Sequence, residues 1–257
     1  MEGQDLEDLR EAKRLLESFG IAIRLANLAG KPMEKAVGML PGEAAAILQK
    51  TVRTALEAAL NVAVKTLGKD GSKVPALSGH KLFAGLSGAA GGAMGMAGLG
   101  FDLPFTTILM LRSIAEIARF HGEDLKNIET RLECLSVFAL GGVSEQDDSS
   151  KTGYFAVRAM LARHVLSAME YITSKGTADR TAPALARLIS LIAERFGEVV
   201  SEKAALAMVP VAGALGGAVV NSLFMDHFQK VATGHFIIRR LERKYGEEKV
   251  RKAFDMA

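Results

Sequence analysis

Three residues in the last quarter of the chain, Asp226, His227 and His235, are of types that bind metals or transfer protons. A zinc-binding helix places two histidines four residues apart on one face. At about 100° per residue, His227 and His235 lie about 80° apart around a helix, and Asp226 lies opposite His235. The spacing does not predict a metal site, so structural or surface histidines are the favoured interpretation.

An alternative hypothesis is a membrane-proximal hydrolase that uses Asp226, His227 or His235 as catalytic groups. It requires these side chains to share one cleft with Asp102, Arg112 or the acidic loop that contains Glu145, Asp147 and Asp148. That loop lacks the spacing of an EF-hand and is expected to be solvated. No serine lies in a G-x-S-x-G motif, and Cys134 in "CLSVFAL" is typical of a core cysteine. The sequence therefore predicts no cofactor and no metal.

The stretch "GAAGGAMGMAGLGFDLPF", residues 88–105, is rich in glycine. A dinucleotide-binding loop needs G-x-G-x-x-G directly after a strand, and "GMAGLG" reverses that spacing with no strand before it. A P-loop needs a lysine, and none lies between Lys81 and Lys126. Glycines four residues apart instead form a flat helix face that another helix or a lipid can approach closely. The glycines predicted to serve this packing or lipid contact are Gly88, Gly92, Gly95, Gly213 and Gly217.

Two uncharged runs are long enough to reach across a bilayer. Residues 82–101 number twenty and residues 204–225 number twenty-two, and at about 1.5 Å per residue both approach the thickness of the hydrocarbon core. Glycine in the first run, Pro210 and Asn221 in the second, and the lack of an aromatic belt count against stable membrane spans. We expect semi-hydrophobic hairpins, at a bilayer or in a protein core; an integral inner-membrane protein is the alternative.

Each uncharged run leads to an aspartate. Asp102 precedes Leu103-Pro104, and proline is tolerated in the first turn of a helix, so Asp102 is predicted to be an N-cap. Asp226 is predicted to cap the last long helix in the same way. The functional alternative is a pair of acidic groups near a pseudo-twofold axis that titrate or bind a cation.

The chain contains an internal similarity. Residues 88–124 placed on residues 212–248 match at eight of 37 positions, and "HGED" corresponds to "YGEE". This indicates a duplication with pseudo-repeats at about 41–140 and 175–257.

Helical periodicity extends over most of the chain, and no strand-and-turn alternation is evident. The predicted fold class is all-α: a multi-helix bundle with internal pseudo-duplication and two glycine-rich apolar helical hairpins packed centrally. Residues 1–40 are expected to form an amphipathic helical segment and residues 41–257 a single domain. A helix is predicted from residue 41 to 67. Further helices are predicted to begin at Asp102, to carry Cys134, and to cover 154–172, 182–197 and the segment that follows Asp226.

The formal net charge of +3 is too small to indicate nucleic acid, and basic and aromatic residues do not interleave. A segment of local charge +4, residues 239–252, follows the second uncharged run. Its residues Arg239, Arg240, Arg243 and Lys244 are predicted to contact anionic lipid headgroups, against the alternative of a solvated helix face. One cysteine and an acidic start without a signal peptide predict a cytoplasmic protein.

Four segments of the chain resemble the EcsC family in the order of that family. They are "FDLPFTTILMLRSIAEIARFHGEDL", "RLECLSVFALGG", "DDSSKTGYFAVRAML" and "AGALGGAVVNSLFMDHFQKVATGHFIIRRLERKYG", within residues 75–250. The resemblance implies a bacterial protein that contacts the membrane and a namesake encoded beside an ABC transporter linked to secretion. It implies no reaction, cofactor or catalytic residue.

Together these features predict an accessory protein that associates peripherally with the cytoplasmic face of the membrane and binds anionic lipid or another apolar ligand. The expected role is linked to an ABC transporter or a secretion system. The alternatives are the hydrolase described above and a purely protein-binding accessory of a transporter complex.

Overall fold

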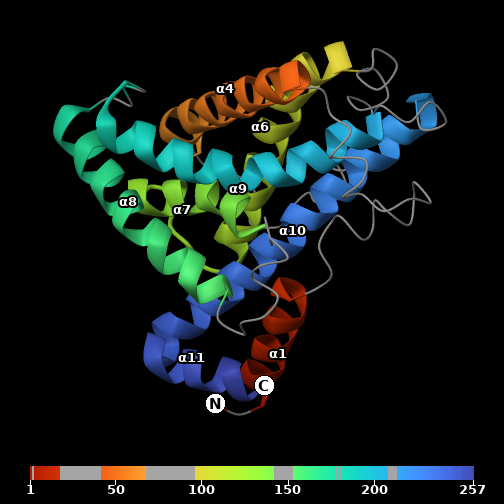
Figure 1. Ribbon diagram of the computed structural model, residues 1–257. Helices are drawn as coiled ribbons and strands as arrows, with labels where there is room; N and C mark the ends of the chain where they lie inside the picture. Colours follow the sequence, from red (N-terminus) through yellow and green to blue (C-terminus); the bar gives the residue numbers. More distant parts are fainter. Residues whose placement is uncertain are drawn as a thin grey trace.

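The computed structural model describes residues 1, 3–17, 42–67, 96–141, 153–176, 179, 181–207 and 213–257. These residues form a bundle of eight helices, and none of them lies in a strand (Figure 1). The all-α fold class predicted from the periodicity is therefore confirmed. The helices are α1 (Gln4–Leu16), α4 (Gly42–Thr66), α6 (Met96–Phe120), α7 (Ile128–Leu140), α8 (Gly153–Lys175), α9 (Pro183–Ala207), α10 (Gly213–Tyr245) and α11 (Glu247–Met256).

The short helix α7 lies at the centre of the bundle. Every residue from Leu132 to Leu140 is buried, so α7 is hydrophobic almost all round, as expected of an enclosed helix. Helices α4, α6, α8, α9 and α10 all pack against it. Phe138 of α7 meets Phe196 of α9 and Phe228 of α10, with ring centroids 4.9 and 5.2 Å apart. These contacts build the main apolar core.

Helix α10 connects this core to a second apolar cluster. It has 33 residues, so it extends for about 50 Å, and in Figure 1 it runs from the upper right of the bundle towards the lower left. Its last third packs with α1 and α11 in a separate cluster, which we call the satellite cluster. The buried members of the satellite cluster are Leu9, Ala12, Ile237, Ile238, Leu241, Val250 and Phe254.

A glycine with positive φ lies at the end of both α6 and α10. Gly122 and Gly246, which the internal similarity aligns, both have φ of 84°, a left-handed conformation that glycine adopts without strain. Gly246 follows directly on the last residue of α10, whereas Gly122 lies two residues after the end of α6. The predicted duplication and the predicted domain boundary near residue 40 both stay predictions.

Most predicted helices are found, and two predicted starts are wrong. The helix expected over 41–67 is α4, and the helices expected over 154–172 and 182–197 are α8 and α9. However, α6 begins at Met96 and contains Pro104, and α10 begins at Gly213 and continues through Asp226. Asp102 and Asp226 are therefore interior helix residues and not N-caps.

The glycines and apolar runs of the sequence are only partly within the described residues. Gly88, Gly92 and Gly95 lie outside them, whereas Gly213 and Gly217 belong to the first turns of α10. Among the helices of the described part, none is long and apolar enough to cross a membrane.

Candidate functional site

The three candidate catalytic residues do not share a site. Asp226 forms an ion pair of 2.9 Å with Lys230 one turn further along α10. His227 is buried and its Nε2 lies 2.8 Å from the carbonyl oxygen of Gly141, at the end of α7. His235, two turns away, is fully buried against other partners. Each histidine is therefore held by structural contacts.

The wider cleft required by the hydrolase hypothesis is also not formed by the described residues. Asp102 is buried, whereas Arg112 is exposed ten residues further along the same helix, about 15 Å away. The acidic loop with Glu145, Asp147 and Asp148 lies outside the described part of the chain. Within that part, no group of three or more His, Cys, Asp or Glu residues could hold a metal ion.

Asp102 instead organises a buried polar cluster where α6, α9 and α10 meet. Its Oδ2 lies 2.6 Å from Nζ of Lys203 on α9, and its Oδ1 accepts hydrogen bonds from Asn221 on α10 at 2.8 Å and from Thr106 at 3.0 Å. We call these four residues and the apolar side chains around them the α6–α9–α10 junction. The carboxylate joins three helices, and its partners Lys203 and Asn221 lie 101 and 119 positions after it in the chain.

The charges of the junction are enclosed. The side chains of Lys203 and Asp102 are 5% and 6% exposed, and the ammonium lies 5.4 Å from the ring centroid of Phe224. Burial lowers the pKa of Lys203, and the Asp102 carboxylate opposes that shift. The two opposite charges compensate each other, so the buried pair has no net charge in its apolar environment.

Two apolar side chains that lie close to junction residues in the sequence are exposed. Phe105 is 50% exposed and lies three residues after Asp102, and Val219 is 44% exposed and lies two residues before Asn221. Because Asp102 and Asn221 are hydrogen-bonded, both exposed side chains lie within about one helical turn of the contact. We call Phe105 and Val219 the apolar rim of the junction. Neither α6 nor α10 has an acidic residue in its first turn.

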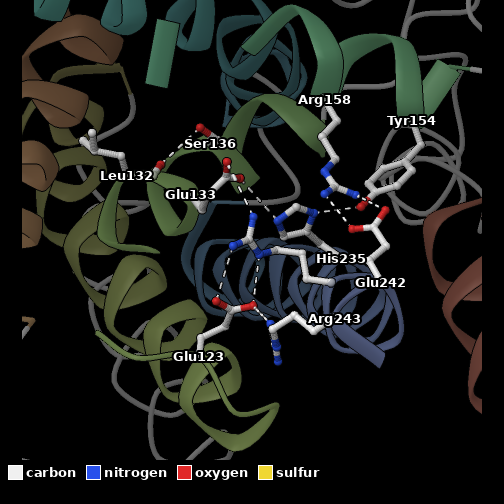
Figure 2. Close-up of polar contacts among 10 residues, drawn as sticks. Glu123, Leu132, Glu133, Ser136, Tyr154, Arg158, His235, Glu242 and Arg243 are labelled. Carbon is white, nitrogen blue, oxygen red and sulfur yellow. Dashed lines mark hydrogen bonds and ion pairs between the residues drawn. The ribbon is translucent and has the colours of Figure 1, made fainter. Parts of the chain in front are cut away.

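A second polar group separates the main core from the satellite cluster. We call it the polar layer; Figure 2 shows most of its members. Arg158 of α8 donates two hydrogen bonds of 2.7 Å to the carboxylate of Glu242, a bidentate geometry with both partners largely buried. The members of the polar layer are Glu123, Glu133, Tyr154, Arg158, His235, Arg239, Glu242 and Arg243.

His235 lies at the centre of the polar layer. Its Nδ1 is 2.8 Å from the Tyr154 hydroxyl, and its Nε2 is 3.6 Å from Oε2 of Glu133. The acceptor-only carboxylate favours the proton on Nε2, which leaves Nδ1 to accept from tyrosine. Burial lowers the pKa of His235, while Glu133 acts in the opposite direction. Burial alone would raise the pKa of Glu133, but His235 and Arg239 lower it. The layer therefore holds a neutral imidazole beside an ionised carboxylate.

The four predicted headgroup contacts all pair with carboxylates inside the molecule. Arg239 donates to Glu123 at 3.0 Å, and Arg243 pairs with the same glutamate. Arg240 pairs with Asp8 of α1, and Lys244 lies 2.5 Å from Oδ2 of Asp5. Arg239 is mostly buried, whereas Lys244 is 61% exposed. Headgroup binding by these residues stays a prediction.

The sequence analysis identified Asp102 but missed its partners and most of the polar layer. Lys203 immediately precedes the second uncharged run, and Glu133 interrupts an apolar helix. The apolar sequence around each of them indicates that the side chain is buried. Tyr154, Arg158 and Glu242 carried no such signal, because their partners lie more than 80 residues away.

The model of the EcsC protein family matches residues 3–241 of the chain. No curated protein and no solved structure matches the chain. The family match includes the α6–α9–α10 junction and all but two residues of the polar layer, and it covers far more than half of the sequence. The chain belongs to the EcsC protein family.

Proposed function

We propose that this protein is a peripheral membrane protein that binds lipid at the apolar rim of the α6–α9–α10 junction, on the cytoplasmic face of the membrane. The observation that carries the proposal is the exposure of Phe105 and Val219 beside a charge pair that is neutralised within the fold. Transfer of exposed apolar surface from water into lipid is favourable, and half-exposed side chains of this size contribute about 1 kcal/mol each.

The enclosed Asp102–Lys203 pair is compatible with binding to a bilayer. An unpaired charge near the bilayer interior is costly, so a lipid-binding surface must keep its charges paired or distant. Lys203 and Asp102 satisfy that condition, because each is the other's counter-ion and both are largely excluded from solvent. The pair itself therefore contributes no net charge where the junction approaches a bilayer.

The two segments of the chain that adjoin the junction are also uncharged. Residues 82–95 precede α6, residues 208–212 separate α9 from α10, and neither segment contains a charged residue. Both segments join the bundle at the helix ends that form the junction.

The test is co-sedimentation with phosphatidylcholine vesicles. The Phe105→Ser/Val219→Ser variant should bind roughly thirtyfold more weakly than the wild type, because two apolar contacts of about 1 kcal/mol each are lost. The matched control is Phe120→Ser, which removes a 61% exposed phenylalanine from the opposite end of α6 and should leave binding unchanged. Wild-type protein that stays in the supernatant, or equal losses in both variants, would refute the proposal.

A further inference from the structure

Helix α1 covers one face of the last third of α10. Leu9 and Ala12 are fully excluded from solvent in the satellite cluster. The two helices approach closely at Gly234, where an added Cβ would lie 2.8 Å from Cγ of Leu16 and 3.0 Å from the carbonyl oxygen of Ala12. The glycine therefore forms the notch in which α1 is seated.

Acidic residues of α1 neutralise basic residues of α10 at this contact. Asp8 pairs with Arg240, and Oδ2 of Asp5 accepts hydrogen bonds from Lys244 at 2.5 Å and from the Tyr245 hydroxyl at 2.7 Å. These two hydrogen bonds lower the pKa of Asp5, and the hydrogen bond to Asp5 raises that of Lys244. The carboxylates thus occupy the positions that anionic groups of a ligand would take.

Most of the contact of α1 is made with the satellite cluster. Its fully buried side chains, Leu9 and Ala12, belong to the satellite cluster, and only Leu16 at its C-terminal end also packs against the main core among the residues of α1 that the structure describes. The ion pairs that hold its first turns involve Lys244, which is 61% exposed, and Arg240, which is 36% exposed. Segments with few core contacts and exposed polar contacts are the ones that open locally while the remainder stays folded.

We propose that α1 is a removable cover, and that the face of α10 beneath it binds an anionic lipid surface. This face combines the apolar side chains Ile237, Ile238 and Leu241 with the cations Arg240 and Lys244, the composition of a helix that lies on an anionic membrane. It lies about 32 Å along α10 from Val219, so it is distinct from the apolar rim of the junction.

The experiment opens the cover without changing a charge. Gly234→Ala places a methyl group in the notch and should displace α1, while alanine is favourable within α10 itself. Amide hydrogen exchange of residues 4–16 should increase. Affinity for mixed phosphatidylcholine–phosphatidylglycerol vesicles should rise about tenfold at low salt, because two basic residues become available. The gain should be lost at high salt and when Arg240→Gln/Lys244→Gln is added.

The matched control is Gly197→Ala in α9, where an added Cβ meets nothing within 4 Å. It should change neither exchange nor affinity. Leu9→Asp is a second opening variant, since it places a charge in the satellite cluster. Faster exchange of α1 with unchanged affinity for the anionic vesicles would overturn the proposal, and so would unchanged exchange in both opening variants. Loss of binding to phosphatidylcholine alone concerns the junction, so the two proposals fail separately.

Discussion

The hydroxyl of Tyr154 on α8 and Nδ1 of His235 on α10 lie 2.8 Å apart in the polar layer, between two separate apolar clusters. Tyr154 packs on both clusters, and its ring lies 4.9 Å from that of Phe155 and 6.3 Å from that of Phe254, by centroid distance. Buried polar groups stabilise a fold only when their partners are correctly placed. The pair therefore fixes how α8 and α10 meet, and Tyr154→Phe should cost about 1–2 kcal/mol of unfolding free energy.

His235 should make the stability of the protein depend on pH. Burial lowers its pKa in the folded state, so below about pH 6.5 the unfolded chain binds a proton that the folded chain does not. Stability should therefore fall as the pH decreases through that value. Burial also lowers the pKa of His121, to about 4, and this acts in the same direction between pH 6.5 and 4.

Urea unfolding at about pH 7.5 and about pH 5.5 measures this dependence. Between these two pH values the stability of the wild type should change less favourably than that of His235→Gln. Burial raises the pKa of Glu202 to about 7, which acts in the opposite direction but equally in both proteins. The control is His164→Gln, which alters a histidine in the shallow groove between α8 and α9. An identical pH dependence in the wild type and in His235→Gln would contradict the account of the polar layer.

Removing one member of the Asp102–Lys203 pair should destabilise the protein far more than replacing both members. Lys203→Met leaves the Asp102 carboxylate buried without its cation, which should cost about 3–5 kcal/mol of unfolding free energy. The double variant Asp102→Asn/Lys203→Met retains an amide for the contacts to Asn221 and Thr106 and should recover much of this loss. Chemical denaturation of the wild type, Asp102→Asn, Lys203→Met and the double variant gives the comparison. Additive losses in the double variant would show that the pair is not coupled.

Gly141 and Gly197 should respond in opposite directions to alanine. At Gly141 an added Cβ would lie 2.6 Å from Cε1 of Phe228 and 3.0 Å from Nε2 of His227. Gly141→Ala should therefore destabilise the protein by about 1–3 kcal/mol. Gly197→Ala has open space inside α9 and should stabilise it by about 0.5–1 kcal/mol. Thermal unfolding distinguishes the two, and a neutral Gly141→Ala would contradict the packing of α10 against the end of α7.

The fold was largely predictable from the sequence because helix periodicity is a local property. The predicted helix over 41–67 agrees with α4, whose buried residues include Leu48, Val52 and Leu56 at four-residue spacing. The start of α6 was not predictable, because Pro104 normally marks a first helical turn. In the fold, Asp102 is held by Lys203 and Asn221, and the helix continues through the proline.

The site was less predictable because its contacts are long-range. The basic residues of α10 suggested a charged surface, but the sequence does not show that Asp5 and Asp8 lie against Arg240 and Lys244 from the other end of the chain. Likewise the sequence suggests a shared site for Asp226, His227 and His235, which lie close together in the chain. In α10 each of them has a different partner. Local spacing predicts faces of helices; pairing depends on how the helices pack.

A fluorophore that reports on the polarity of its surroundings tests lipid binding at the apolar rim most directly. Phe105→Cys introduces a reactive thiol at an exposed position, while the native Cys134 is fully buried and burial raises its pKa, so it should not react in the folded protein. With phosphatidylcholine vesicles, a label at position 105 should shift to the blue, whereas a label introduced through Phe120→Cys should not. Equal spectra at position 105 with and without vesicles would contradict the proposed function.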